Sequence, residues 1–196
     1  MGRQAAYVRE DAVRSARDVF WREGYEGASM ASLQRATGLN ASSLYHAFGS
    51  KRGLFDAAVE DYLERVVRPG LGPLQGPEVA PDALEGYFRA ARELFADPSG
   101  RTLPDGCLLV NTACSGLARD DGIAEAVRAY RAELGAAFLR GAAARFPTGA
   151  ADEHERLAET CVALLVSALV MTRVDRGAAL ASLDAALSHL TTEDTP

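Results

Sequence analysis

The stretch SMASLQRATGLNASSLYHAFGSKRGLF, residues 29–55, contains a regular series of helix signals. Capping side chains alternate in it with glycines, in the order Ser29, Gly38, Asn40, Gly49 and Ser50. Ser and Asn side chains accept hydrogen bonds from the first free amides of a helix, and glycine tolerates the left-handed backbone on which helices often end. The stretch therefore predicts two short helices joined by a tight turn, followed directly by the start of a third.

The second of these helices has one apolar face and one face of small polar residues. Leu44 and Phe48 are four residues apart, so they face the core together. The outward-facing residues are Ala41, Ser42, Ser43, Tyr45 and His46. A helix that follows a tight turn and presents such a face is typical of a DNA-binding helix-turn-helix, whose second helix enters the major groove.

The same positions resemble the TetR family of one-component transcription regulators. The matching residues are Thr37-Gly38-Leu39, Leu44-Tyr45, Phe48, Ser50-Lys51 and Leu54-Phe55. The resemblance covers about the first third of the chain, and it implies an all-α protein with a three-helix DNA-binding head and a C-terminal helical bundle for ligand binding and dimerisation. Ala47 departs from the pattern, because many members carry His or Tyr there; we therefore expect Tyr45 and His46 to take over that phosphate contact.

The resemblance and the helix geometry together suggest roles for individual residues. The residues expected on the floor of the groove are Asn40, Ala41, Ser42 and Ser43, with the Ala41 methyl able to meet a thymine methyl. Those expected at phosphates are Tyr45, His46, Lys51 and the N-terminal helix end at Ser29. Gln34 and Arg35, outside on the preceding helix, either add a base or phosphate contact or form a solvated surface.

The net charge of −6 is divided unevenly along the chain. Residues 1–55 contain eight Lys and Arg against five Asp and Glu, a net charge of +3, so the remainder carries −9. A basic head on an acidic body concentrates phosphate attraction in the head. This distribution favours double-stranded DNA as the partner of the head.

The remaining composition indicates an all-helical chain without a membrane segment. Ala, Leu, Arg and Glu dominate, and no alternating β-branched runs occur. No apolar run approaches the roughly 20 residues of a membrane span, and no apolar signal core follows the N-terminus, so we expect a cytoplasmic protein. The three cysteines form neither a CxxC motif nor a His/Cys cluster, which predicts reduced thiols and no metal site or cofactor.

Apolar periodicity predicts further helices along the chain. Their expected ranges are 10–24, 51–67, 82–96, 106–117, 121–146, 152–172 and 176–190. Arg68-Pro69-Gly70 should end the helix at 51–67, and the Pro/Gly-rich residues 69–81 should form a connector. We expect a DNA-binding domain at 1–55 and a ligand-sensing and dimerisation domain at 68–196, joined by the helix at 51–67.

The last two predicted helices carry apolar residues on more than one face, with small Ala and Ser between the leucines. Such helices are either buried inside one chain or paired with the same helices of a second copy. The TetR resemblance implies pairing, and a palindromic operator requires a two-fold symmetric protein. We therefore expect a homodimer formed through these two helices.

Several residues of the body are candidates for contact with an effector. They are Tyr87, Phe88, Cys107, Asn111, Tyr130, Phe138 and Met171. The aromatic side chains and Met171 could line a pocket for a small apolar or aromatic molecule, or simply form the core. Asn111 is a polar group on the most apolar helix, so it needs a partner from the backbone, water or a ligand.

Cys107 lies in a Gly-Cys-Leu segment that resembles a subset of TetR-type regulators. We expect it in the first turn of the helix at 106–117, where the amide dipoles favour a thiolate. The alternative is that Cys107 packs as a small apolar group.

No pattern in the sequence predicts an enzyme, because no Gly-rich phosphate loop, HExxH or nucleophile elbow occurs. The sequence therefore predicts a one-component regulator, a repressor released from a palindromic operator by a small effector. The first alternative is a thiol-based redox or electrophile sensor switched at Cys107. The second, from another class, is a non-catalytic helical module whose helix-turn-helix contacts protein.

Overall fold

The structure, a computed structural model, describes residues 2–97 and 105–191, and within these ranges it is all-α. The helices are α1 (Gly2–Gly27), α2 (Met30–Thr37), α3 (Ala41–Phe48), α4 (Lys51–Tyr62), η1 (Leu63–Val67), α5 (Arg68–Gln75), α6 (Ala83–Ala96), α7 (Leu108–Ala113), η2 (Gly116–Arg119), α8 (Asp121–Arg145), α9 (Ala151–Met171) and α10 (Arg176–Thr191). The predicted fold class is confirmed. No helix among the described residues is long and apolar enough to cross a membrane.

The N-terminal head forms where the sequence predicts it. Ser29, Asn40 and Ser50 are the N-caps of α2, α3 and α4, and each side chain accepts a hydrogen bond from a backbone amide three residues later. Gly38 ends α2 with a φ of 69°. α1 begins before the expected range 10–24, because the preceding residues contain helix formers and no proline, and its helical backbone breaks at Gly24 (φ 72°, ψ 170°), as the sequence predicts.

The helix that leaves the head does not end at Arg68-Pro69-Gly70, so the predicted connector at 69–81 is wrong for its first part, residues 69–75. α4 passes into the π-helical segment η1, and α5 continues to Gln75. Pro69 occupies the first turn of α5, where no intrahelical bond to its nitrogen is needed. Leu71 and Leu74 are fully buried, and this burial holds the segment as a helix despite Pro73.

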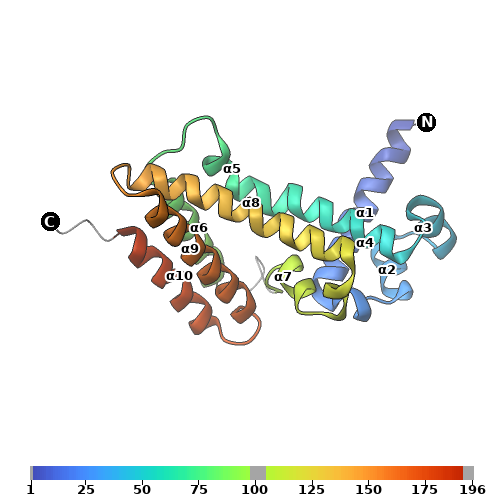
Figure 1. The fold of residues 1–196 in the computed structure, drawn as a ribbon. Coiled ribbons are helices and arrows are strands. Elements are labelled where there is room, and N and C mark those ends of the chain that lie inside the picture. Colours follow the sequence, from blue (N-terminus) through green and yellow to red (C-terminus); the bar gives the residue numbers. More distant parts are fainter. Residues whose placement is uncertain (1, 98–104, 192–196) are drawn as a thin grey trace.

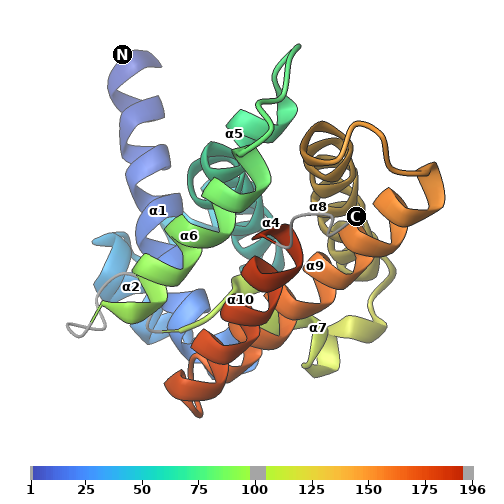
Figure 2. The same ribbon diagram turned by 90° about the vertical axis from the view of Figure 1, so that its left-hand side faces the viewer.

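The helical segment made of α4, η1 and α5 joins two parts of an elongated molecule. Figure 1 shows α1 to α4 at one end, with α9 and α10 at the other and the long helix α8 running between them. In the turned view, α6, α9 and α10 lie close together (Figure 2), and α10 packs on both α6 and α9. α5 packs on α8 and α6, so the outgoing helix becomes part of the body.

The expected helix at 106–117 is two shorter pieces, α7 and the 3-10 turn η2. Gly106 has a φ of 69°, and a side chain there would lie 2.6 Å from the Leu169 carbonyl oxygen. Cys107 is the N-cap residue of α7, with an extended backbone. The expectation that Cys107 lies inside the first helical turn is therefore wrong, and its placement reflects the tight passage of the chain at Gly106.

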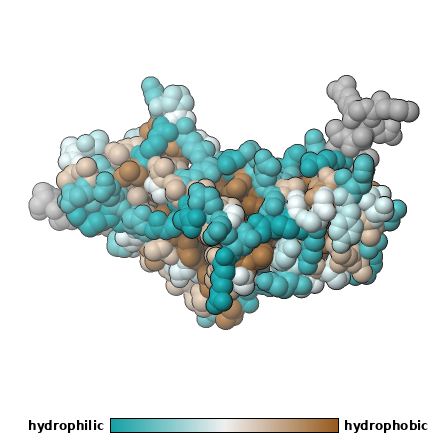
Figure 3. All heavy atoms as spheres, turned by 45° about the vertical axis from the view of Figure 1, so that its right-hand side comes forward, coloured by the Kyte–Doolittle hydropathy of each residue, from teal (hydrophilic) through white to brown (hydrophobic). Residues whose placement is uncertain are grey.

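One continuous cluster of buried side chains runs from the head into the body. It includes Phe20 and Phe55 in the head, Tyr62 at the junction, and Phe88 and Phe138 in the body. On the face seen in Figure 3, hydrophilic residues cover most of the surface and apolar residues show mainly toward the middle. The head is thus packed on the body rather than attached by a free linker.

The close contact of α8 with α5 and α6 depends on Gly141. A Cβ at this position would lie 2.7 Å from Leu84 Cβ and 2.8 Å from Leu74 Cδ2. We predict that Gly141→Ala lowers the free energy of unfolding by about 1–3 kcal/mol through overpacking. Urea unfolding followed by circular dichroism measures the change.

Gly135→Ala on the same helix is the matched control, because a Cβ at Gly135 meets nothing within 4 Å. It should be neutral or stabilise the protein by up to about 1 kcal/mol, since alanine favours a helix interior over glycine. Equal effects of the two substitutions would show that helix propensity, and not the close contact, governs position 141.

Candidate DNA-binding surface and ligand cavity

The exposed face of α3 is held in place from its N-terminus and from its apolar side. The Asn40 carboxamide oxygen accepts the Ser43 amide at 2.8 Å. Leu44 is buried and Phe48 is half-buried, which leaves Ser42, Ser43, Tyr45 and His46 exposed. These exposed residues lie on one short helix, as a surface for the major groove requires.

Gln34 has a role inside the motif that the sequence did not suggest. Its carboxamide oxygen accepts the Ala41 backbone amide at 3.1 Å, and its nitrogen donates to the Met30 carbonyl oxygen at 3.2 Å. The side chain therefore ties α2 to the first turn of α3. Arg35, the next residue, is exposed.

Two cationic side chains, Lys51 at the start of α4 and Arg9 on α1, pack on aromatic rings of the head. The Lys51 ammonium lies 4.5 Å from the centre of the Tyr25 ring, and the Arg9 guanidinium lies 4.9 Å from that of Phe48. These cation–π contacts hold both charges against the head while leaving them near its surface. Ser29 is likewise exposed at the N-terminus of α2, where helix amides attract an anion.

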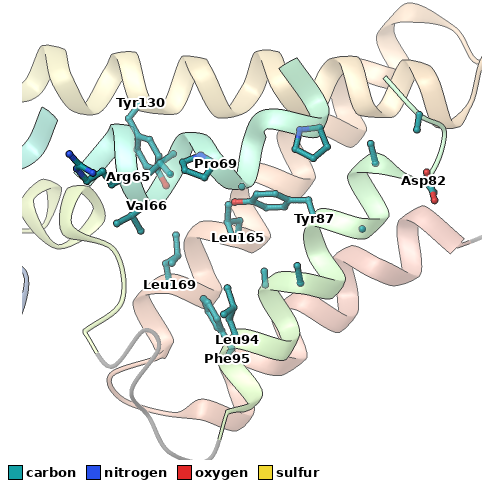
Figure 4. Close-up of a pocket in the computed structure, with 18 of the residues that line it drawn as sticks. Arg65, Val66, Pro69, Asp82, Tyr87, Leu94, Phe95, Tyr130, Leu165 and Leu169 are labelled. Atoms are coloured by element: carbon teal, nitrogen blue, oxygen red, sulfur yellow. The ribbon is translucent and has the colours of Figure 1, made fainter. Parts of the chain in front are cut away.

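A cavity of about 830 Å³ opens in the body beside the junction with the head (Figure 4). Its wall combines residues from η1, α5, α6, α8 and α9, including Val66, Pro69, Leu94, Leu165 and Leu169. This volume is within the range of small-molecule sites, and the wall is largely apolar. The last residue of α4, Tyr62, also lines the cavity.

Polar groups reach the cavity at few points. Tyr62, Tyr87 and Tyr130 contribute phenol groups, and Arg65 lies at one end. The Cys107 thiol donates to the Tyr130 hydroxyl at 3.7 Å from behind the wall. Burial raises the pKa of Tyr62 and Tyr130 well above 10, with a further contribution from the nearby Cys107, so both phenols stay neutral.

Only some of the expected effector residues line this cavity. Tyr87 and Tyr130 do. Phe88 and Phe138 are fully buried behind Tyr87, where the three rings pack with centres 5.1–5.5 Å apart. Cys107, Asn111 and Met171 are not part of the wall, and the Asn111 amide donates to the Asp105 carbonyl oxygen at 2.7 Å. The wall residues on α5 were missed because the sequence predicted no helix beyond 67, and those on η1 were predicted only as part of the helix that joins the two domains.

Two polar contacts join the head to the body. The Arg52 guanidinium meets both carboxylate oxygens of Asp120, at 2.8 and 2.9 Å. The Trp21 indole donates to the Gly106 carbonyl oxygen at 3.0 Å. The first contact links the N-terminus of α4 to that of α8, and the second links α1 to the segment that carries Cys107.

Comparison with known proteins agrees with this geometry. Residues 12–58 match the family of bacterial regulatory proteins described as the tetR family. A solved structure of a cysteine mutant of the TetR family transcriptional regulator CifR, complexed with 26-bp double-strand operator DNA, is 34% identical. The similarity covers 90% of this chain and 94% of that one, with a TM-score of 0.73. The chain belongs to the TetR family.

The names of related proteins also describe transcription regulators of the helix-turn-helix (HTH) type. The HTH-type transcriptional repressor ComR of Escherichia coli (strain K12) is 35% identical over 122 residues, which are 62% of this chain and 56% of ComR. An uncharacterized HTH-type transcriptional regulator, YezE of Bacillus subtilis (strain 168), is 29% identical over 72% of this chain and 71% of its own. The match thus spans little more than half the length of ComR. TetR-family regulators are non-enzymatic DNA-binding proteins.

The Arg52–Asp120 ion pair should make stability depend on pH. The Arg52 guanidinium lowers the pKa of Asp120 to about 2, helped by the Ile123 amide. The pKa of Asp in an unfolded chain is about 3.9, so the ionised carboxylate stabilises the folded protein above that pH. We predict that Asp120→Asn lowers the melting temperature at neutral pH, and that its deficit shrinks as the pH falls from about 4 to about 2.

Asp121→Asn is the control, because Asp121 is an exposed neighbour in the first turn of the same helix. Asn is itself a good helix cap, so Asp120→Asn removes the charge while retaining a capping side chain. Thermal unfolding across this pH range compares the two. The same pH-dependent deficit in both variants would assign the effect to the α8 dipole instead of to Arg52.

Proposed function

We propose that this TetR-family chain is a homodimeric transcriptional repressor that leaves a palindromic operator when a small molecule occupies its cavity. The observation that carries the proposal is the capped helix α3, which presents Ser42, Ser43, Tyr45 and His46 to solvent beside the cation of Lys51. The structural similarity to CifR bound to operator DNA supports the same use of this surface. A repressor that binds operator DNA acts on the chromosome, so the protein works in the cytoplasm.

A stripe of small and apolar residues along α9 supports dimerisation. Ala163, Ser167 and Val170 are exposed on α9 and spaced three or four residues apart, so they share one face, and Val174 is exposed in the turn that follows the helix. Val170 is 42% exposed and Val174 is 79% exposed. Ser167 is within 3.0 Å of Ser182 on α10, which brings both helices to the same surface. Successive major grooves require the two α3 helices of a dimer to lie about 34–36 Å apart, and a second copy seated on this face is the arrangement we propose for it.

The cavity and the head share one helical segment, which supports control by an effector. Tyr62, Arg65, Val66 and Val67 line the cavity, and the segment that carries them begins at Lys51 on the DNA-binding surface. A π-helical turn is a common place for a local change in helix geometry. A molecule that binds one arrangement of this turn better than the other would shift the tilt of α4 and the spacing of the two heads.

Fluorescence anisotropy on DNA from the upstream region of its own gene tests the proposal. We predict that Lys51→Ala weakens binding and reduces the slope of log affinity against log salt concentration by about 1, because one phosphate contact is lost. Tyr45→Ala should weaken binding as well. The control is Arg156→Ala, which removes an exposed cation on α9 that is paired with Asp152.

An affinity for DNA that does not change with salt concentration would contradict the proposal and favour the protein-interaction module. So would an affinity that is the same in the wild-type protein and in a Tyr45→Ala/Lys51→Ala double variant. A largely apolar protein contact releases few counterions, so its affinity changes little with salt. If the upstream fragment itself is not bound, selection of bound fragments from genomic DNA replaces it before the same salt titration.

A thiol-switched repressor is the second candidate, and the position of Cys107 favours it. The thiol is fully buried against Tyr130 of α8 and also lies beside Tyr62 of α4. An adduct or oxidised sulfur there would add atoms at the point where the head helix meets the body. A reactive cysteine usually has a cationic neighbour, and the recorded hydrogen-bond partner here is a phenol, which places this candidate second.

Hydrogen peroxide treatment before the anisotropy measurement tests the thiol switch. Under that hypothesis we predict loss of operator binding by the wild-type protein and retention by Cys107→Ser. Cys161→Ser is the matched control, because Cys161 is equally buried and burial raises its pKa to about 12. Operator binding that survives peroxide in the wild-type protein would leave the cavity as the regulatory site.

A further inference from the structure

The Tyr87 hydroxyl is a hydrogen-bonding group on the wall of the cavity. The ring packs on Phe88 and Phe138, with ring centres 5.5 and 5.1 Å apart, and these contacts fix its direction. Figure 4 shows the hydroxyl turned toward the middle of the cavity. Within the part of the chain that the structure describes, no side chain or backbone group is recorded as its hydrogen-bond partner. Tyr87 is half-buried, and its hydroxyl is reached from the cavity, so a molecule bound there can accept its hydrogen bond in place of water.

A second phenol is arranged to donate into the same space. The Tyr130 hydroxyl accepts a hydrogen bond from the Cys107 thiol, so its own proton remains available to the cavity. In Figure 4 this hydroxyl also turns toward the middle of the cavity, from the opposite wall to Tyr87. Burial raises the pKa of Tyr87 well above 10, as it does for Tyr130, so both groups are neutral donors at physiological pH.

The charged residues of the wall do not provide a partner for an ionic ligand. Arg65 is already paired with Asp61 at 2.8 Å and with Glu10 at 3.8 Å. Glu78 and Asp82 are exposed, so water screens their charges. An anion would approach past these carboxylates, and a cation would lose its hydration beside the buried apolar wall without a counter-charge there.

We infer that the cavity selects a neutral, largely apolar molecule that carries a hydrogen-bond acceptor oxygen, such as a ketone, ester or ether, and that Tyr87 donates to this oxygen. The apolar part lies against Val66, Leu165 and Leu169. This inference rests on the proposed function, because it names the chemical class of the effector. A molecule bound in the cavity lies beside η1, the helical turn that connects the body to α4 and the head.

Four probes that share a phenylalkyl group separate the possible ligand classes. They are benzylacetone, a neutral ketone; butylbenzene, which has no acceptor; phenylbutyrate, an anion; and phenylbutylamine, a cation. Isothermal calorimetry on the DNA-free protein measures each affinity. The single tryptophan, Trp21, gives an independent fluorescence signal, because its ring packs 4.9 Å from that of Tyr62 on the cavity wall.

We predict that benzylacetone binds more tightly than the other three probes. One hydrogen bond to a buried donor should give it an advantage over butylbenzene of about threefold to tenfold. Tyr87→Phe should remove this advantage and leave the affinity for butylbenzene unchanged, because the ring contacts with Phe88 and Phe138 are kept. Tyr25→Phe is the control for the loss of a phenol outside the cavity, and it should keep the preference for the ketone.

Tighter binding of either ion, a ketone preference that survives Tyr87→Phe, or failure of all four probes to bind would overturn the inference. Operator binding is measured separately. Ketone binding by a protein that recognises no DNA would contradict the proposed function alone. Operator binding by a protein that does not prefer the ketone would contradict this inference alone.

Discussion

The packing of Tyr62 is the contact on which the arrangement of the molecule most depends. Its ring meets Trp21 of α1 edge to face, and its hydroxyl lies against the Leu108 amide and the Cys107 thiol of the body. It is also the last residue of α4 and part of the cavity wall. Because one side chain belongs to all three places, the head cannot change its angle without repacking the cavity. Regulation at a distance then requires only a local rearrangement beside this residue.

Polar contacts define the same junction from two sides. Arg52 reaches Asp120 at the start of α8, and Trp21 reaches the Gly106 carbonyl oxygen. Arg17 and Asp61 form a further pair at 2.8 Å with both side chains nearly buried. Each of these contacts has a definite geometry, in contrast to the apolar contacts around it. A rotation of the head would break some of these polar contacts and force the apolar side chains around them to repack, so the junction favours discrete head positions over a continuous range.

The sequence predicted the head well because its signals are local. Capping residues and glycines act within one turn of helix, so Ser29, Asn40 and Ser50 could be assigned from their neighbours alone. The bond from the Ala41 amide to Gln34 was not predicted for the opposite reason, since it crosses the turn between two helices. Proline at 69 was read as a stop, but burial of Leu71 and Leu74 against the body outweighs this local preference.

The sequence by itself determined the all-α class, the helix-turn-helix and the division of charge, because composition, capping and period depend on residues close together in the chain. Only the tertiary structure decided where the cavity lies and which groups face it. The cavity wall is assembled from helices far apart in sequence. Tyr87 is positioned on this wall by packing on Phe138, and the Tyr130 hydroxyl is held there by its hydrogen bond with Cys107. The continuation of the helix through η1 and α5 also depends on tertiary contacts. Its stability comes from leucines buried on α8 and α6, and long-range burial of this kind leaves no local signal in the sequence.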